Sequence, residues 1–255
     1  MAKEDYTTYT EVDTANDRIQ KTANHIDFVS SRNNEETYLY KDYGVDHFGD
    51  FTHKVDACQT AGNWVGHVWG LSNTEDELLD CSLRISLYFY YAGGGAASNI
   101  YLGELYDGNA YFDGFNNFSL NTTYYFLIKK TGTALKCGIY STAALRDAGD
   151  ATDGDIDNLA LTLHADHKFR YIYGCSSHTL TTEQTGTFDI DNLDLQEGGV
   201  THTASATLAG AGSLAALGRR LLAGKATLSG TGALSAKGSY LHLATATLSG
   251  TATLS

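Results

Sequence analysis

Five aspartates gather in residues 147–157, DAGDATDGDID. Carboxylate oxygens are the ligands that Ca²⁺ prefers, and the ion takes roughly six to eight oxygens. The segment departs from an EF-hand, because a run that starts at Asp153 has no glycine at its sixth position and no glutamate at its twelfth. We therefore prefer a solvated acidic loop. Weak calcium binding is the alternative, with no other cofactor indicated, and its ligands would be Asp150, Asp153, Asp155 and Asp157.

A second chemical pattern is the abundance of tyrosine, with 17 tyrosines against 10 phenylalanines. In residues 81–91, CSLRISLYFYY, apolar side chains alternate with Arg84, Ser86, Tyr88 and Tyr90, as in a strand with one buried face. Flat aromatic faces beside a few polar groups suit the stacking and hydrogen bonding of sugars. We therefore predict a ligand site at Arg84, Tyr88 and Tyr90, with Trp64 as a further member. The alternative is that these rings pack against another part of the molecule or a neighbouring subunit.

Other catalytic and metal patterns are absent from the sequence. The four cysteines, Cys58, Cys81, Cys137 and Cys175, form no CxxC pair, so the spacing of a zinc or thioredoxin site is missing. Buried reduced thiols are preferred over two disulfides, because cytoplasmic synthesis disfavours disulfides. The histidine pairs DHFGDFTH and HADH do not set up a tetrahedral site on strands, so satisfied or exposed histidines are expected.

Charge divides the chain into two parts near Gly198. Residues 1–200 hold 13 basic and 30 acidic residues, a net charge of −17, whereas residues 201–255 hold four basic residues and no acidic one. An acidic body argues against nucleic acid as a partner, because phosphate contacts need a basic face. We predict one domain over residues 1–198 and a tail over residues 199–255.

The N-terminus and the hydropathy pattern indicate a cytoplasmic site of synthesis. The start MAKEDYTTYTEVD has neither the basic region nor the apolar run of a signal peptide, and no stretch is long and apolar enough for a membrane span. We expect no membrane insertion.

The body has the pattern of an antiparallel β-sandwich. About a dozen short alternating segments lie between residues 6 and 196, separated by Gly, Asn and Asp, and no convincing amphipathic helix interrupts them. NWVGHVWGL predicts a strand with Val65, His67, Trp69 and Leu71 on one face. TYYFLIKKTGTALKCGIYS predicts two strands joined by a tight turn at residues 130–133, where Gly132 permits a positive φ.

The order of these segments resembles a known family. ETYLYKDYGVDHFGDFTHKVDA, VGHVWGLSN, TTYYFLIKKTGTALKCGIYST, FRYIYGCSS and FDIDNLDL follow one another as in the concanavalin A-like jelly rolls, the laminin G-like and glucanase-like sandwiches. The chain looks most like versions from phage and environmental viral proteins, in which Ala-Thr-Leu-Ser-Gly-type repeats follow the sandwich. This resemblance covers roughly residues 5–197 and implies a jelly roll. It does not choose among lectins, receptor-binding tips and glycanases, because a shared fold does not fix function.

The enzymatic branch of that family is not indicated. Its laminarinase-type members carry a Glu-x-Asp-x-Glu strand whose alternate carboxylates act as nucleophile and acid, and no such triplet occurs here. The nearest pattern, Asp189-Ile190-Asp191 with Asp194, falls in the expected closing strand. Glu75, Asp76 and Glu77 lie between strands. We therefore predict a protein that is not an enzyme, with a laminarinase-type glycoside hydrolase as the weakest alternative.

The tail consists of a 20-residue repeat present in two and a half copies, such as ATLSGTGALSAKGSYLHLAT at residues 226–245. Alternation of Ala, Leu and Gly with Thr and Ser predicts strands, and a short helix in SLAALGRRLLAGK is the alternative. Two and a half copies are too few for an independent solenoid core, so we expect a flexible tail or one that pairs with tails of other subunits. The sequence thus predicts a virion or surface structural protein, placed on the particle after assembly. Its sandwich binds glycan or another surface, and its tail mediates self-association. A decoration or filament subunit without ligand is the rival interpretation.

Overall fold

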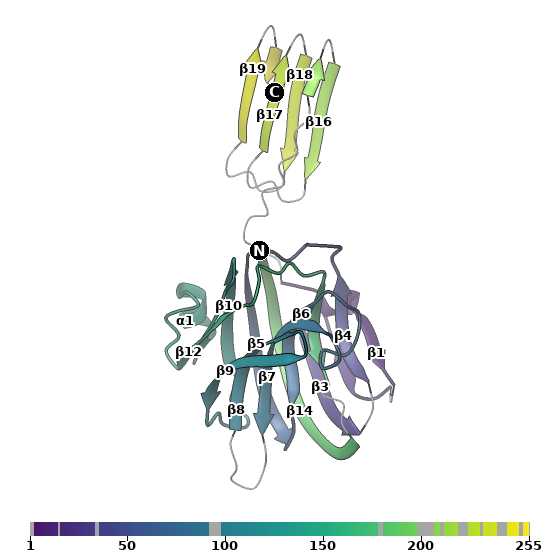
Figure 1. The fold of residues 1–255 in the computed structure, drawn as a ribbon, viewed down its shortest axis with the longest axis vertical. Helices are drawn as coiled ribbons and strands as arrows, with labels where there is room; N and C mark the ends of the chain where they lie inside the picture. Colours follow the sequence, from purple (N-terminus) through teal and green to yellow (C-terminus); the bar gives the residue numbers. More distant parts are fainter. Residues whose placement is uncertain are drawn as a thin grey trace. The chain divides into compact units, whose positions relative to one another are not determined.

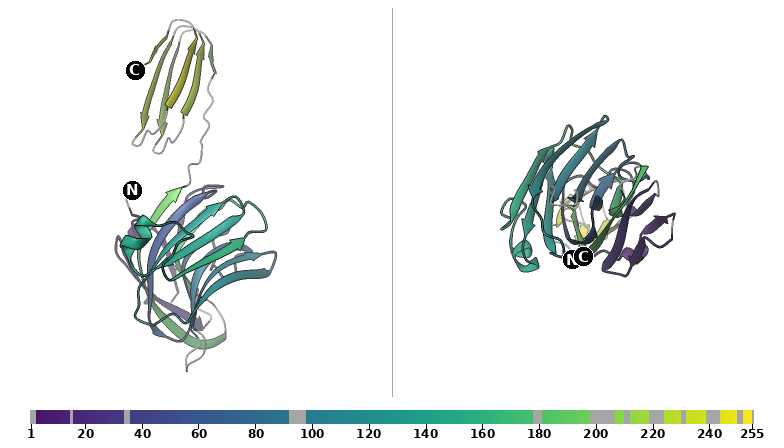
Figure 2. Two further views of the ribbon diagram at one scale, coloured as in Figure 1. Left: turned by 90° about the vertical axis from the view of Figure 1, so that its left-hand side faces the viewer. Right: turned by 90° about the horizontal axis from the view of Figure 1, so that it is seen from below.

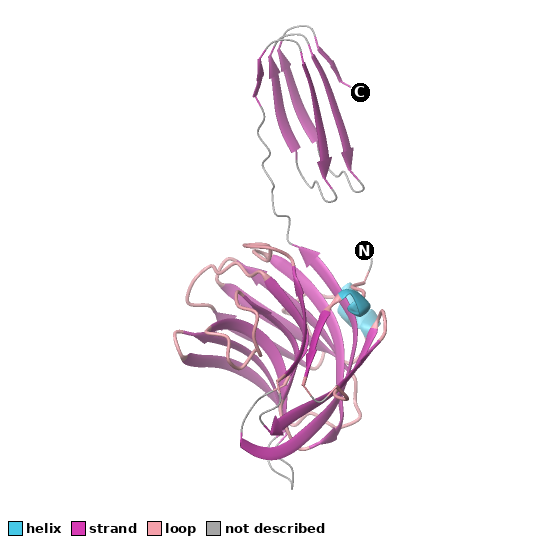
Figure 3. Ribbon diagram, turned by 90° about the vertical axis from the view of Figure 1, so that its right-hand side faces the viewer, coloured by secondary structure: helices cyan, strands magenta, loops and turns pink. Residues whose placement is uncertain are grey.

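The chain divides into two compact units, Met1–Gly198 and Gly199–Ser255. In the computed structural model, the first unit is described over residues 3–14, 16–33, 36–91, 98–177 and 181–197. The second is described over residues 207–209, 212–218, 224–229, 232–238, 244–249 and 252–254. The division falls where the composition of the sequence changes. Strands dominate both units (Figures 1 and 3).

The first unit is a sandwich of two seven-stranded sheets whose paired strands are antiparallel (Figures 1 and 2). Sheet A has the order β1 (Thr10–Asp13), β4 (Thr37–Asp42), β13 (Tyr171–Ser176), β6 (Gly66–Ser72), β7 (Leu83–Tyr91), β8 (Ser98–Tyr106) and β9 (Asn109–Asn116). Sheet B has the order β12 (Asp157–Thr162), β11 (Ala134–Tyr140), β10 (Tyr124–Thr131), β5 (Phe51–Gly62), β14 (Thr181–Glu197), β3 (His25–Asn33) and β2 (Ile19–Lys21). The predicted antiparallel sandwich is confirmed.

The core lies between the sheets and follows the alternation of the sequence. On β7, Ile85, Leu87 and Phe89 are fully buried in the main apolar cluster, as predicted. Because successive side chains of a strand point to opposite faces, Arg84, Ser86, Tyr88 and Tyr90 lie on the face of sheet A turned away from the core. We call this face the outer face of sheet A. It carries the features discussed below.

A bulge corrects the predicted faces of β6. We expected Val65, His67, Trp69 and Leu71 on one face, but the pairing of β6 with β7 shifts between His67 and Trp69. His67 lies opposite Tyr88 and shares its outer face, whereas Trp69 lies opposite Leu87 and is buried in the core. One extra residue, Val68, also enters the core. A bulge of this kind re-aims every later side chain, which simple alternation cannot anticipate.

The loop of residues 73–82, between β6 and β7, covers part of the outer face; we call it the covering loop. Its Leu78 is fully buried in a cluster with four tyrosines of β4 and β13, namely Tyr38, Tyr40, Tyr171 and Tyr173. The Leu78 amide donates to Ser176 Oγ (3.0 Å), and the Tyr173 hydroxyl donates to the carbonyl of Thr74 (2.9 Å). Gly70 makes room beneath the loop, because a Cβ there would stand 2.5 Å from Leu78 Cδ1.

Three smaller expectations are resolved by the fold. The β10–β11 hairpin turns at Gly132, whose φ is +55°, as predicted. All four cysteines are buried and free, in agreement with the preferred interpretation. The sequence did not indicate one short helix, α1 (Ala143–Ala148), or the 3₁₀ turn at Tyr6–Thr8. Thr142 caps α1, because its hydroxyl accepts from the Leu145 amide (3.2 Å).

The described parts of the tail form parallel strands, which confirms the strand prediction there. One sheet contains β15 (Thr207–Ala209), β17 (Gly224–Ser229) and β19 (Ala244–Ser249), and the other contains β16 (Gly212–Gly218), β18 (Gly232–Gly238) and β20 (Ala252–Leu254). Each strand pairs with the strand one repeat later, so that Leu208, Leu228 and Leu248 align.

This pairing corrects one statement about the tail. The helical alternative for SLAALGRRLLAGK is wrong over Gly212–Gly218, which is strand; residues 219–223 of it lie outside the described residues. Successive repeats of the same chain pair with one another, because a 20-residue offset places like residues side by side. Pairing with the tails of other subunits stays a prediction.

None of the helices in the described ranges is long and apolar enough to cross a bilayer.

Candidate ligand-binding site

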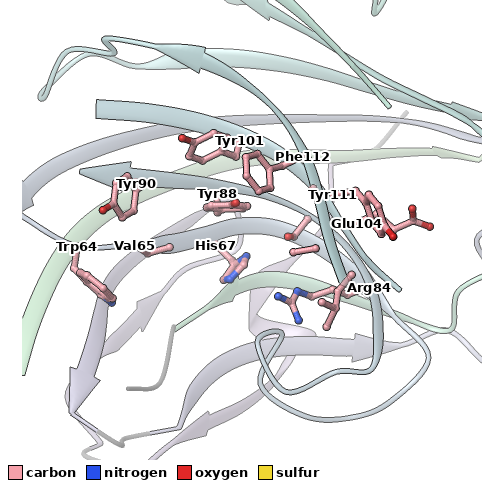
Figure 4. Close-up of a pocket in the computed structure, with 14 residues that line it drawn as sticks. Trp64, Val65, His67, Arg84, Tyr88, Tyr90, Tyr101, Glu104, Tyr111 and Phe112 are labelled. Atoms are coloured by element: carbon pink, nitrogen blue, oxygen red, sulfur yellow. The ribbon is translucent and has the colours of Figure 1, made fainter. Parts of the chain in front are cut away.

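A pocket of about 300 Å³ opens on sheet A beside the covering loop (Figure 4). It is contributed by β6 to β9 and by the two residues that precede β6. We call it the aromatic pocket. Its lining residues are Trp64, Val65, His67, Arg84, Ser86, Tyr88, Tyr90, Tyr101, Gly103, Glu104, Leu105, Ala110, Tyr111 and Phe112.

All four residues predicted from the sequence to bind ligand line this one pocket. Arg84, Tyr88 and Tyr90 come from the outer face of β7, and Trp64 comes from the turn before β6. Trp64 and Tyr90 approach each other edge to face, with ring centroids 6.5 Å apart. The structure therefore brings Trp64 together with three residues that lie 20 or more positions later in the sequence. Whether these four residues bind a ligand stays a prediction.

Sequence reasoning missed Tyr101, Phe112 and His67 as members. Tyr101 lies opposite Tyr88 on the neighbouring strand, with ring centroids 5.3 Å apart, and Phe112 packs edge to face on Tyr101 at 5.1 Å. His67 lies 5.2 Å from the Tyr88 ring. The alternation of SNIYLGELY was a signal for Tyr101, but only the strand order reveals that this segment is the neighbour of β7.

Glycine keeps the aromatic rings close to the sheet. A Cβ at Gly114 would stand 2.5 Å from the Tyr101 ring, and a Cβ at Gly103 would stand 3.4 Å from the Tyr88 ring. A Cβ at Gly114 would clash with the Tyr101 ring, whereas a Cβ at Gly103 would lie at the lower limit of ordinary contact with the Tyr88 ring. The Tyr101 ring therefore occupies the space that a side chain at position 114 would take. Gly103 is itself a lining residue, and Gly114 makes room for the Tyr101 ring.

The open end of the pocket exposes aromatic surface. Phe112 is 57% exposed, and Tyr88, Tyr90 and Tyr101 are half-buried. Burial raises the pKa of Tyr88 to about 12, so its hydroxyl is neutral at physiological pH and is both a donor and an acceptor. The pocket therefore offers several aromatic ring faces and the neutral hydroxyl of Tyr88 to a ligand.

Arg84 stands where the pocket meets the covering loop. Its Nη1 donates to the carbonyls of Leu79 (2.7 Å) and Cys81 (3.3 Å). These contacts fix the guanidinium beside the rings, and burial lowers its pKa from the ordinary value. An arginine remains charged under such a shift, because its ordinary pKa is far above neutrality.

The side chains of two lining residues, Glu104 and Tyr111, lie on the core-facing side of sheet A and not on its outer face. Glu104 lies directly opposite the core residue Ile85, and Tyr111 lies directly opposite Glu104, so both belong to the core-facing side of sheet A. The buried Glu104 carboxylate accepts from the ring Nδ1 of His164 (2.9 Å) and lies 3.6 Å from His167 Nε2. The Tyr111 ring packs on His164 at 4.2 Å. The carboxylate is thus held by histidines at the edge of the sandwich.

The four aspartates suggested for calcium do not converge. Asp150 accepts from Lys129 Nζ (3.0 Å), Asp155 accepts from the Ser141 amide (2.9 Å), and Asp157 accepts from the Asn158 amide (2.8 Å). Asp153 accepts from the Tyr140 hydroxyl, and this hydrogen bond is the main cause that lowers the pKa of Asp153. The donors to Asp150 and Asp153 come from β10 and β11, and those to Asp155 and Asp157 are nearby backbone amides. Calcium binding here is left without geometric support.

One group of three metal-capable side chains does converge among the described residues, and it lies on sheet B. His25, Asp27 and Asp189 place one ligand atom each within 4.8 Å of one another. Asp191 accepts from His25 Nδ1 (2.8 Å). Asp189 and Asp191 are the carboxylates that most resembled a glycanase strand, and β14 places them in the sheet that does not form the aromatic pocket.

Comparison with known proteins supports the fold and goes no further. No family model and no curated protein matches the chain. Among solved structures it is similar to a functionally unknown protein from Saccharomyces cerevisiae, with 9% identity and a TM-score of 0.51 over 76% of this chain and 98% of that one.

Two further structures are similar at lower TM-scores. The carbohydrate-binding module CBM66 from Bacillus subtilis has 11% identity and a TM-score of 0.40 over 76% of this chain and 96% of that one. The PL7 alginate lyase AlyA1 from Zobellia galactanivorans has 10% identity and a TM-score of 0.45 over 72% of this chain and 82% of that one. At such identities the likeness concerns the β-sandwich alone and does not bear on a viral source.

Proposed function

We propose that the aromatic pocket binds a glycan and that the protein does not cleave it. The observation that carries this proposal is the collection of rings around one cavity on the outer face of sheet A: Phe112 is exposed, Tyr88, Tyr90 and Tyr101 are half-buried, and Trp64 is buried. Sugar rings present C–H faces that stack on aromatic rings, and hydroxyls that hydrogen-bond to neighbouring polar groups. The pocket offers both, with His67, Ser86 and the Tyr88 hydroxyl as polar groups.

The arrangement of carboxylates favours binding over hydrolysis. Glycoside hydrolases generally use two carboxylates that flank the scissile bond, about 5 to 9.5 Å apart. Among the lining residues Glu104 carries the single carboxylate, and that group is held by His164 on the core-facing side of the sheet. A pair that could act as acid and nucleophile is therefore missing from the lining.

The tail extends this proposal from one site to many. Its repeats pair in parallel and form two three-stranded sheets. The edge strands of such sheets can pair with identical strands from another chain. Linking several sandwiches would raise apparent affinity by about 100-fold or more without any new contact. Self-association through the tail, and a place on a virion or other particle surface, stay predictions. A subunit without ligand remains the rival.

A glycan panel tests the proposal. Purified protein is applied to immobilised glycans and separately incubated with them, and new reducing ends are measured. We expect retention on some glycans without release of fragments. Val45→Ala, which truncates a side chain that is 76% exposed and outside the pocket lining, serves as the control and is expected to bind like the wild type. A blank panel, or cleavage by the wild-type protein, contradicts the proposal.

A further inference from the structure

Arg84 differs from the other arginines of the sandwich. Four arginines have side chains that the structure describes, and three of them contact a carboxylate. These are Arg18 with Asp17 (3.5 Å), Arg146 with Asp56, and Arg170 with Asp42 (2.6 Å). Among the described residues no carboxylate lies within ion-pair distance of Arg84, whose hydrogen bonds go to two backbone carbonyls.

The surroundings do not neutralise this charge. On the outer face, the neighbours of Arg84 are Ser86 on the same strand, Ser72 on β6 and Leu105 on β8, none of which is acidic. Glu77 and Asp80 of the covering loop act on Arg84 electrostatically from beyond ion-pair distance. Glu104 faces the other side of the sheet. Among the lining side chains on the outer face, Arg84 therefore carries the one permanent charge, which is positive, in a chain whose net charge is −13.

The geometry of the guanidinium leaves donors for a ligand. The hydrogen bonds to Leu79 and Cys81 use Nη1 alone. Nε and Nη2 donate to no described atom of the protein. A guanidinium presents its N–H groups as a flat fork that matches the two oxygens of a carboxylate or sulfate, and hydrogen bonds between charged groups are stronger than neutral ones. The two carbonyls hold the fork in place before a ligand arrives, which reduces the entropy lost on binding.

We infer that the aromatic pocket recognises an acidic glycan, in which Arg84 binds a carboxylate or sulfate group of a sugar while the neighbouring rings stack on it. This inference rests on the proposed function, because it names the substrate class of the same pocket. The anionic group gives specificity, since a neutral sugar would offer no negative charge to the Nε and Nη2 donors of the guanidinium.

The test compares acidic and neutral forms of one glycan on the wild-type protein. Calorimetric titration uses a short oligogalacturonate, the same oligosaccharide with its carboxylates methyl-esterified, and a sulfated galactan oligosaccharide. We expect at least one acidic probe to bind roughly 10- to 100-fold more tightly than the ester, the factor that a charged hydrogen-bonded pair supplies. Comparison of the two acidic probes identifies carboxylate or sulfate as the source. Added salt should weaken the acidic probe's binding more than the ester's.

Substitution at Arg84 then assigns the effect to one side chain. Arg84→Gln should remove the preference for the acidic probe, lowering the affinity for that probe roughly 10- to 100-fold, so that it approaches the affinity for the ester. Arg84→Lys keeps the charge but not the forked donor geometry. Its affinity for the acidic probe should lie between the affinities of Arg84→Gln and the wild type. Because Arg84 also holds the covering loop, melting curves accompany both variants, and the wild-type comparison stands even if a variant does not fold.

Three results would overturn the inference. Equal binding of the ester and the acidic probes by the wild type would leave glycan binding intact and remove the acidic specificity. If folded Arg84→Gln lost affinity equally for the acidic probe and the ester, Arg84 would serve only to hold the covering loop in place. Binding of neither an acidic nor a neutral glycan would contradict the proposed function itself, and the inference with it.

Discussion

The outer face of sheet A carries tyrosines in two halves that have different fates. On β4 and β13, Tyr38, Tyr40, Tyr171 and Tyr173 are buried beneath the covering loop. On β7 and β8, Tyr88, Tyr90 and Tyr101 are half-buried and line a pocket. We call these the covered half and the open half. The residue type and the sheet are the same, and the covering loop lies over one half and not the other, which separates tyrosines that pack in a cluster from tyrosines that line a pocket.

Two hydroxyls of the covered half donate hydrogen bonds to the covering loop. Tyr173 donates to the Thr74 carbonyl, and Tyr40 donates to Glu75, both on the covering loop. A buried hydroxyl without a partner costs free energy, so these bonds explain why the loop contains a glutamate and a backbone turn above the rings. The open half has no such cover. Its aromatic surface remains in contact with solvent, as a binding surface requires.

The largest expected effect comes from the residue that fastens the loop. Leu78→Ala removes a fully buried side chain from the tyrosine cluster, and we expect the free energy of unfolding to fall by about 2 to 5 kcal/mol. Phe112→Ala, the matched truncation in the open half, should change it by about 0.5 kcal/mol or less, because the ring is mostly exposed. Urea denaturation of both variants measures the difference. Equal losses would mean that the two halves do not differ as described.

The next effect concerns ligand affinity and belongs to the open half. Replacement of Tyr88 and Tyr90 together by Ala should weaken glycan binding by about 1 to 3 kcal/mol and leave a cooperatively folded sandwich, because stacked rings dominate the contact energy. Calorimetry with the tightest ligand of the glycan panel, and melting curves, check the two parts. Unchanged affinity would remove the proposed site, and loss of folding would assign both rings to the core.

How far the sequence predicted these halves depends on the range of the interactions. Arg84, Tyr88 and Tyr90 were predictable because their alternation with Ile85 and Leu87 is local to one strand. Tyr101 and Phe112 were not, because they join the site through strand order and register, which depend on residues far away in the chain.

The covered half was not predictable for a related reason. The covering loop reads as a run of acidic residues between strands, and nothing in NTEDELLD indicates that Leu78 packs on rings from β4 and β13. The bulge at Val68, which turns His67 into the pocket, also lacks a local signal. For the acidic segment 147–157 we preferred a solvated loop to a calcium site. Its aspartates accept hydrogen bonds from the Ser141 and Asn158 amides, and closeness in sequence alone does not reveal these partners.

A smaller effect tests the hydrogen bonds of the covered half. Tyr173→Phe removes the hydroxyl that donates to Thr74, and we expect the free energy of unfolding to fall by about 0.5 to 1.5 kcal/mol. The conservative change retains the ring and its packing. Differential scanning calorimetry measures the loss, with Tyr90→Phe in the open half as the control. A larger loss for Tyr90→Phe would reverse the assignment of the two halves.

The smallest effect is a dependence of stability on alkaline pH. Burial, followed by the hydrogen bond to Glu75, raises the pKa of Tyr40 to about 12 from its ordinary value of 10.0. The unfolded chain ionises first, so the contribution of Tyr40 is fully present below pH 10 and is lost as the pH rises toward 12. Denaturation at several pH values between 10 and 12 measures how steeply the free energy of unfolding falls with pH. Tyr40→Phe should make this fall less steep, and an unchanged fall would show that the pKa of Tyr40 is not raised in the folded protein.

The central claim is that a glycan occupies the open half and not the covered half. It is tested most directly by NMR, with the backbone amides of the isotope-labelled protein followed as the oligogalacturonate and its methyl ester are added. The account predicts shifts in β7, β8 and β9 and in residues 64–67, with the amides of β4 and β13 unchanged. Shifts confined to sheet B or to the covered half, or no shifts with any glycan that the protein retains, would contradict it.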